Sequence, residues 1–101
     1  RLKNMESINI NSIKNLATTL NLLGDIVRLE IVIYLLTQES SVNQLASHLN
    51  ISQPLASHHL RLLKDARIVE ASRYGKQIFY RLKDDKIKSF LEQTLNSGVI
   101  K

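Results

Sequence analysis

The segment from Ser41 to Ala66 constrains the fold of this chain more than any other part of its sequence. It has the sequence SVNQLASHLNISQPLASHHLRLLKDA, which contains two apolar patterns of helical spacing separated by Asn50-Ile51. Ser52 can cap the second helix, because its hydroxyl can accept a hydrogen bond from a free backbone N–H. Two short helices joined by a tight turn, the second with a polar and basic outer face, predict a helix-turn-helix.

Two features beside the turn support the boundaries of these helices. Ser40 or Ser41 can cap the first helix, which we expect over residues 42–49. Pro54 falls in the first turn of the second helix, where its missing N–H has no partner within the helix to lose. The proline therefore favours a helix start at this position rather than an interruption.

Apolar residues at helical spacing predict further helices on both sides of this segment. The first helix is expected over residues 7–23 and ends at Gly24, and Asp25 can cap a second helix. Towards the other end of the chain, Asp84 or Asp85 opens a last helix whose apolar residues lie on one side.

After Ala66 the apolar pattern changes from a helical period to alternation, which predicts β-structure. Alternation from Ile68 to Ser72, and again over residues 77–82, flanks Gly75, which supplies the conformational freedom of a tight turn. The predicted fold is mainly α with a small β-hairpin (α+β), in the order α-α-α-α-β-β-α. This is the arrangement of a winged helix-turn-helix, and we expect residues 1–101 to form one domain.

Composition limits the partners and sites that this chain of 101 residues can have. The net charge of +5 at pH 7 favours a polyanionic partner, although charge alone fits RNA or an acidic membrane as well as DNA. The absence of cysteine excludes disulfides, thiolate metal sites and cysteine redox sensing. No apolar run approaches the roughly 20 residues of a membrane span, and no signal peptide is visible. We therefore expect a cytoplasmic protein with no membrane partner.

The second helix of the helix-turn-helix has an apolar stripe and a polar face. Ala56, Leu60 and Leu63 have the spacing of one helix face and should pack on the preceding helices. Arginine and histidine can donate to guanine, glutamine can bond adenine, and serine can bond a base or a phosphate. For His59 we expect helix packing or a phosphate contact. The residues that we predict to lie at the DNA are Ser52, Gln53, Pro54, Ser57, His58, His59, Arg61 and Lys64.

The basic hairpin that follows is a candidate wing beside this helix. Its tip combines cations with an aromatic residue and an amide, and the residues that we expect to contact DNA are Arg73, Tyr74, Lys76 and Gln77. Contacts to phosphates by such a wing increase affinity and its salt dependence more than specificity. A charged edge strand that only keeps the protein soluble, and an ordinary solvated helix face, are the alternative interpretations.

At these residues the chain resembles the ArsR/SmtB family, small bacterial winged helix-turn-helix repressors that dimerise through their first and last helices. The resemblance covers nearly the whole chain. One departure is Ile26-Val27, where the family often has a proline and a threonine before the arginine. The resemblance rests on Leu23-Gly24-Asp25, Arg28-Leu29, the segment SVNQLASHLNISQPLASHHLRLLKDARIV, Gly75 and Phe79-Tyr80-Arg81-Leu82.

The first and last helices, at about residues 7–23 and 84–97, are the expected dimer interface. They have more apolar surface than a small core plausibly absorbs, and a C2 dimer would cover this surface. Such a dimer would space two recognition helices roughly one DNA turn apart, as a palindromic site requires. Completion of a monomeric core is the alternative. The interface residues that we predict are Ile13, Leu16, Leu20, Ile87, Phe90, Leu91 and Leu95.

The resemblance also raises the question of metal sensing, because many relatives release DNA on binding a metal. Ser41 and Asn43 stand where one family site has cysteines. At the other family site Asp84 matches the first ligand, but Lys86 replaces the histidine, and Ser97 and Ile100 replace the second pair of ligands. Zinc needs more ligands than one aspartate supplies. We therefore expect no metal and no cofactor, and the effector is unknown.

The three histidines do not change this expectation. His58 and His59 are adjacent, so they project about 100° apart on a helix and do not form a chelating pair. His48 is expected to cap the end of its helix or to lie at the surface.

The sequence as a whole predicts a transcriptional regulator rather than an enzyme, because no nucleophile–base pair or phosphate loop is visible. We expect a homodimeric, sequence-specific repressor of the ArsR/SmtB type that binds double-stranded DNA at a palindromic operator. The alternative is a winged-helix module for nonspecific nucleic-acid binding or protein association.

Overall fold

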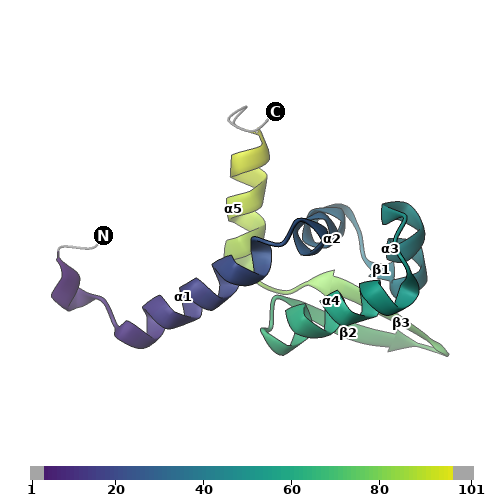
Figure 1. Ribbon diagram of the computed structural model, residues 1–101, viewed down its shortest axis with the longest axis horizontal. Coiled ribbons are helices and arrows are strands. Elements are labelled where there is room, and N and C mark those ends of the chain that lie inside the picture. The colour runs from purple at the N-terminus through teal and green to yellow at the C-terminus, as the bar shows by residue number, and fades with distance from the viewer. Residues whose placement is uncertain (1–3, 97–101) are drawn as a thin grey trace.

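The computed structural model describes residues 4–96, so Ser97 and Ile100 of the second predicted metal pair, and the expected end of the last helix, lie outside the described residues. The elements follow the predicted order, with two short additions (Figure 1). They are the 3-10 helix η1 (Met5–Ser7), α1 (Ile10–Leu23), α2 (Ile26–Thr37), β1 (Ser40–Ser41), α3 (Val42–Leu49), α4 (Gln53–Asp65), β2 (Val69–Tyr74), β3 (Gln77–Leu82) and α5 (Asp85–Asn96).

Local capping explains where α1 ends and where α2 and α3 begin. Gly24 ends α1, and its N–H donates to the Leu20 carbonyl at 2.9 Å. The Asp25 carboxylate caps α2, and Ser41 caps α3 in a reciprocal capping box with Gln44. These ends confirm the predictions for Gly24 and Asp25, and select Ser41 of the two serines that the sequence allowed.

The start of α1 is later than the sequence predicts. Asn9 caps the helix, with its side-chain oxygen accepting from the Asn11 N–H at 2.7 Å. Of the described residues before Asn9, Met5–Ser7 form the single turn of η1 and Ile8 is extended. Asparagine is a strong N-cap residue, and this local preference moves the helix start from residue 7 to Ile10.

The wing belongs to a three-stranded sheet with the order β1-β3-β2. The predicted hairpin is confirmed, with Tyr74 opposite Gln77 across a two-residue turn in which Gly75 has a φ of 65°. The strand β1, in which Ser40 pairs with Tyr80, was not predicted from the sequence. This short strand ties the start of α3 to the base of the wing.

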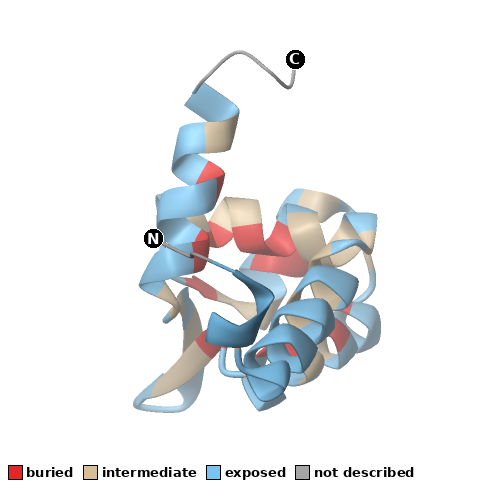
Figure 2. Cartoon of the chain, turned by 90° about the vertical axis from the view of Figure 1, so that its left-hand side faces the viewer, coloured by how far each residue is buried: buried red, intermediate tan, exposed pale blue. Residues whose placement is uncertain are grey.

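One apolar core joins α2, α3, α4, the sheet and the first two turns of α5. Figure 2 shows the buried residues gathered in the body of the molecule, whereas α1 has no buried residue. Figure 1 shows α1 projecting away from this body. The buried core cluster consists of Ile31, Val32, Leu35, Leu45, Leu60, Leu63, Ile68, Val69, Ile87 and Leu91.

The predicted fold class, mainly α with a small β-hairpin in a winged helix-turn-helix, is confirmed. Within residues 4–96, no helix combines the length and the apolar character that crossing a bilayer would need.

Candidate nucleic-acid interface

Helix α4 is fixed by one face and exposed on the other. The Ser52 hydroxyl caps it by accepting from the Leu55 N–H at 3.2 Å, and Pro54 lies in the first turn as predicted. Ala56, Leu60 and Leu63 are completely buried, so the apolar stripe is held in the core. The opposite face is open to solvent: Ser57 is half-buried, and Ser52, Gln53, Pro54, His58, Arg61 and Lys64 are exposed.

The structure corrects the placement of His59 among the residues at the DNA. His59 is only 7% exposed, and its Nδ1 lies 3.3 Å from Nη1 of Arg28 in α2. Burial lowers the pKa of this imidazole, because the charged form loses solvation. His59 therefore takes the packing role, the first of the two that the sequence allowed.

The start of α4 is also tied to the start of α3. The Gln53 side-chain amide donates to the Asn43 side-chain oxygen, and both residues are exposed. Asn43 was not among the predicted DNA contacts, since sequence spacing does not reveal that α3 and α4 bring these two side chains together. The bond leaves the Gln53 carbonyl oxygen as a free acceptor.

The tip of the wing lies beside the start of α3. Ser41, Asn43, Lys76 and Gln77 line a shallow groove of about 230 Å³ between these two elements. Thus the structure places two of the predicted wing residues on the same side of the molecule as the amino-terminal ends of the helix-turn-helix.

The four predicted wing residues, Arg73, Tyr74, Lys76 and Gln77, are all exposed. The Tyr74 ring packs edge-on against Phe79 with 5.6 Å between centroids, which orders the aromatic side chain at the tip. Arg81, at the base of the wing, forms an ion pair with Glu70 across the strands. Arg73 and Lys76 are therefore the cations of the wing that are best placed to bind phosphates.

Removal of these two cations should weaken DNA binding without regard to sequence. For the variant Arg73→Ala/Lys76→Ala we expect the slope of log affinity against log salt to fall by about 1 per cation. Fluorescence anisotropy with a labelled duplex at several salt concentrations measures this slope. Lys83→Ala, which removes one cation at the base of the hairpin, is the control for each charge, and a fall in the slope of about 1 from it would contradict the assignment to the wing tip.

A second exposed surface is apolar and lies on α1 and α5. Ile13, Leu16, Leu20, Phe90 and Leu95 are between 37% and 59% exposed although all are large and hydrophobic. Two apolar hollows of about 250 and 320 Å³ adjoin them, and Leu20, Leu23 and Phe90 line both. These five residues are the apolar face of α1 and α5.

Ile87 and Leu91, which were also predicted as interface residues, contribute little exposed surface to this face, although each lines one of the two hollows. They are only 8% and 6% exposed, because they turn inward to the core of their own chain. The apolar side of α5 is therefore divided between the core and the exterior, a division that helical spacing alone does not resolve.

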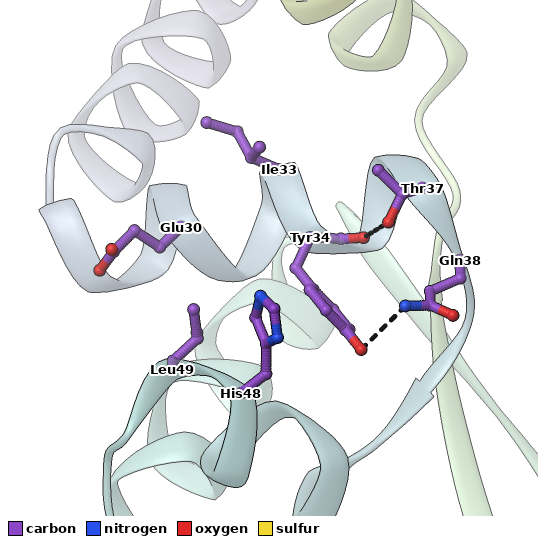
Figure 3. A pocket seen from close by; sticks show the side chains of 7 residues that line it. All are labelled: Glu30, Ile33, Tyr34, Thr37, Gln38, His48 and Leu49. Carbon is purple, nitrogen blue, oxygen red and sulfur yellow. Dashed lines mark hydrogen bonds between the residues drawn. The ribbon is translucent and has the colours of Figure 1, made fainter.

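An open cleft of about 450 Å³ lies between α2 and α3 (Figure 3). The rings of Tyr34 and His48 meet in it, with 4.4 Å between their centroids. The Tyr34 hydroxyl accepts from the Gln38 amide at 2.9 Å. His48 thus lies at the surface near the end of α3, the second of the two positions that the sequence allowed.

Asp84, the residue that matches one ligand of a family metal site, has a structural role in α5. Asp84 caps the start of α5, where its Oδ1 accepts from the N–H groups of Lys86 at 2.9 Å and Ile87 at 3.1 Å. Among residues 4–96, no three histidine, aspartate or glutamate side chains are grouped so that they could hold a metal ion.

A polar helix face beside a basic β-hairpin, both fixed on a small helical core, defines a winged helix-turn-helix protein. Residues 25–71 match the family described as "Bacterial regulatory protein, arsR family". The chain belongs to this family, which confirms the resemblance seen in the sequence.

Individual relatives agree with this membership. The chain is 41% identical to the HTH-type transcriptional repressor SmtB of Mycobacterium tuberculosis, over 57% of its own length and 43% of that protein. It is 32% identical to the transcriptional repressor SdpR of Bacillus subtilis, over 73% of its own length and 82% of that protein. Among solved structures, the transcriptional repressor BigR from Xylella fastidiosa has a TM-score of 0.77 and 31% identity, covering 93% of this chain and 100% of that one.

The match to SmtB spans less than half the length of that relative. The family and these relatives are described as regulators of transcription, in agreement with the prediction of a regulator.

Proposed function

We propose that the chain is a homodimeric transcriptional repressor that binds a palindromic operator in double-stranded DNA. The observation that carries this proposal is the division of α4, whose apolar stripe is completely buried while its polar face is exposed. A helix held in this way can enter the major groove without unfolding any part of the core. Its relatives SmtB, SdpR and BigR are described as repressors, which supports the same role here.

Within this proposal the exposed residues of α4 determine specificity. His58 and Arg61 are three positions apart, so they lie on adjacent turns of one helix face. Both can donate to guanine in the major groove, and Gln53 and Ser57 can bond a base edge or a phosphate. Ser52, Pro54 and Lys64 lie at the two ends of the same surface.

The wing contributes affinity rather than specificity. Arg73 and Lys76 can each neutralise a phosphate, while Tyr74 and Gln77 lie beside them at the tip. The net charge of +5 favours the same partner at long range.

A second copy of the chain supplies the other half of the site. The apolar face of α1 and α5 is the surface that we propose for the contact between copies, because five large hydrophobic side chains there are exposed to water. A C2 pair presents two α4 helices with the symmetry of a palindrome. Since the proposed partner is chromosomal DNA, we place the protein in the bacterial cytoplasm.

Selection from a library of random DNA duplexes tests the proposed function. We expect the recovered sequences to share an inverted repeat whose half-sites lie about 10 base pairs apart, centre to centre. Recovery of no common sequence would contradict the proposal and favour nonspecific nucleic-acid binding or protein association.

The variants Arg61→Ala and His58→Ala should each lose affinity for the selected duplex by about 1–3 kcal/mol, because each removes a base contact. Affinity for a scrambled duplex should fall much less. Competition binding with both duplexes measures the two effects. Lys88→Ala, which removes one positive charge from α5, is the control; normal binding of the selected duplex by Arg61→Ala would show that the base-contacting face is assigned wrongly.

A further inference from the structure

The Arg28 side chain bridges three helices. Its Nε donates to the Leu22 carbonyl at the end of α1 at 2.7 Å, and its Nη1 lies 3.3 Å from His59 Nδ1 in α4. Its own backbone N–H is held by the Asp25 carboxylate at 3.0 Å, at the cap of α2. The guanidinium therefore fixes the position of α4 relative to the end of α1.

The bond to His59 requires a neutral imidazole. Arginine carries only donors, so Nδ1 must be the acceptor and the ring proton must lie on Nε2. Loss of solvation lowers the pKa of His59, and the charges of Arg28 and His58 act in the same direction, against the opposing effect of Asp25. Asp25 and Arg28 act from α2, and His58 acts from α4 itself.

The position of this bond connects the two surfaces of the proposed function. His59 follows His58 directly and precedes Arg61 by two residues, so the buried bond lies behind the face that we propose contacts bases. Leu22 follows Leu20 of the apolar face of α1 and α5 by two residues. In a C2 dimer, the distance between the two α4 helices depends on how each is fixed to its own α1.

We propose that Arg28 is a positioning residue for specific DNA binding, and that a proton on His59 releases the α4 helix from it. This inference rests on the proposed function. Protonation would place an imidazolium against a guanidinium and remove the acceptor of the bond. Because burial lowers the pKa of His59 below its ordinary value of 6.5, the imidazole is neutral and the link intact at neutral pH, and the link is lost as the pH falls through this lowered pKa.

Four variants separate the contributions to this link. Arg28→Met removes both bonds, and Arg28→Lys keeps the charge but offers a single ammonium for two acceptors. His59→Leu removes the acceptor, whereas His59→Asn keeps an acceptor near the position of Nδ1 and does not titrate. Lys88→Met, which removes one positive charge from exposed α5, is the matched control. Circular dichroism identifies any variant that does not fold.

The probe is the duplex that wild-type protein selects from a random library, with a scrambled duplex as reference. At neutral pH we expect Arg28→Met and His59→Leu to bind the selected duplex about tenfold more weakly, with little change for the scrambled one. Arg28→Lys should be intermediate, and His59→Asn and Lys88→Met should resemble the wild type. Wild-type binding of Arg28→Met, in a folded protein, would overturn the proposal.

A pH profile provides a readout that a merely structural role would not change. As the pH decreases below 6.5, wild-type preference for the selected duplex should fall, and His59→Asn should lack this loss. NMR titration of the His59 ring, without DNA, should show a higher pKa in Arg28→Met than in wild type, because one cation is removed. Equal acid sensitivity of wild type and His59→Asn would overturn the proposal.

Failure of this inference and failure of the proposed function give different results. A wild-type protein without sequence preference contradicts the proposed function, and this inference with it. A wild-type protein that is specific, together with an Arg28→Met variant that is equally specific, contradicts only the role of Arg28.

Discussion

The variant Leu20→Glu is expected to be a monomer that binds DNA only weakly. Leu20 is 57% exposed in one chain, and we propose that a second copy covers it. Burial of a leucine contributes about 1.5–3 kcal/mol, and a C2 interface contains two copies, so the dimer loses about 3–6 kcal/mol. This corresponds to a rise of about 10²- to 10⁴-fold in the dimer dissociation constant.

Sedimentation equilibrium measures the dissociation constant, and anisotropy with a palindromic duplex measures the consequence for DNA binding. Thr18→Glu is the matched control, because it adds the same charge to α1 two residues away, on nearly the opposite side of the helix. Phe90→Glu, on α5, should behave like Leu20→Glu. Dimers of normal stability in both Leu20→Glu and Phe90→Glu would contradict the proposed interface.

The variant Leu60→Ala should lose about 2–5 kcal/mol of unfolding free energy. Leu60 is completely buried in the core cluster, and removal of its side chain both loses hydrophobic burial and leaves a cavity. A domain of this size has about 5–15 kcal/mol of stability, so a large part of the total is lost. Urea denaturation followed by circular dichroism measures this difference.

Leu55→Ala tests whether the unfolding free energy lost in Leu60→Ala depends on the burial of Leu60, or is lost on truncation of any leucine in α4. Leu55 lies in the same helix and is 39% exposed, so its truncation should cost less than about 1 kcal/mol. Equal losses in the two variants would show that α4 is not anchored through the apolar stripe. DNA binding by Leu60→Ala should fall in proportion to the fraction of unfolded protein rather than through any lost contact.

Features that depend on neighbouring residues in the chain could be predicted from the sequence. Gly24, Asp25 and Ser52 end or begin helices through hydrogen bonds to residues within four positions of them. The turn at Gly75 likewise depends on local backbone freedom. Local chemistry of this kind is visible in a single sequence, and the order of the main elements followed from it.

Features that depend on distant residues could not be predicted in the same way. The strand β1 has only two residues and exists because β3 pairs with it some forty positions later. His59 is polar and adjacent to exposed His58, and only its contact with Arg28, 31 positions away, shows that it packs inside. The apolar pattern of α5 likewise could not show that Ile87 and Leu91 serve the core while Phe90 is exposed.

Some features of the candidate DNA surface could be predicted from the sequence, and others could not. The helical period predicts the apolar stripe of Ala56, Leu60 and Leu63, which is buried. The residues on the opposite face are therefore exposed, and they are Gln53, His58, Arg61 and Lys64. The contact between Gln53 and Asn43 depends on how α3 and α4 cross, which the sequence does not encode in any short pattern.

The most direct test of the central claim compares two duplexes of equal length and composition, one with the selected inverted repeat and one scrambled. Anisotropy titrations with the wild-type chain at several salt concentrations give both affinities and both salt slopes. The proposed repressor should bind the repeat at least about 10³-fold more tightly than the scrambled duplex at physiological salt, and both affinities should fall with salt. Equal affinity for the two duplexes would contradict sequence-specific DNA binding by this protein.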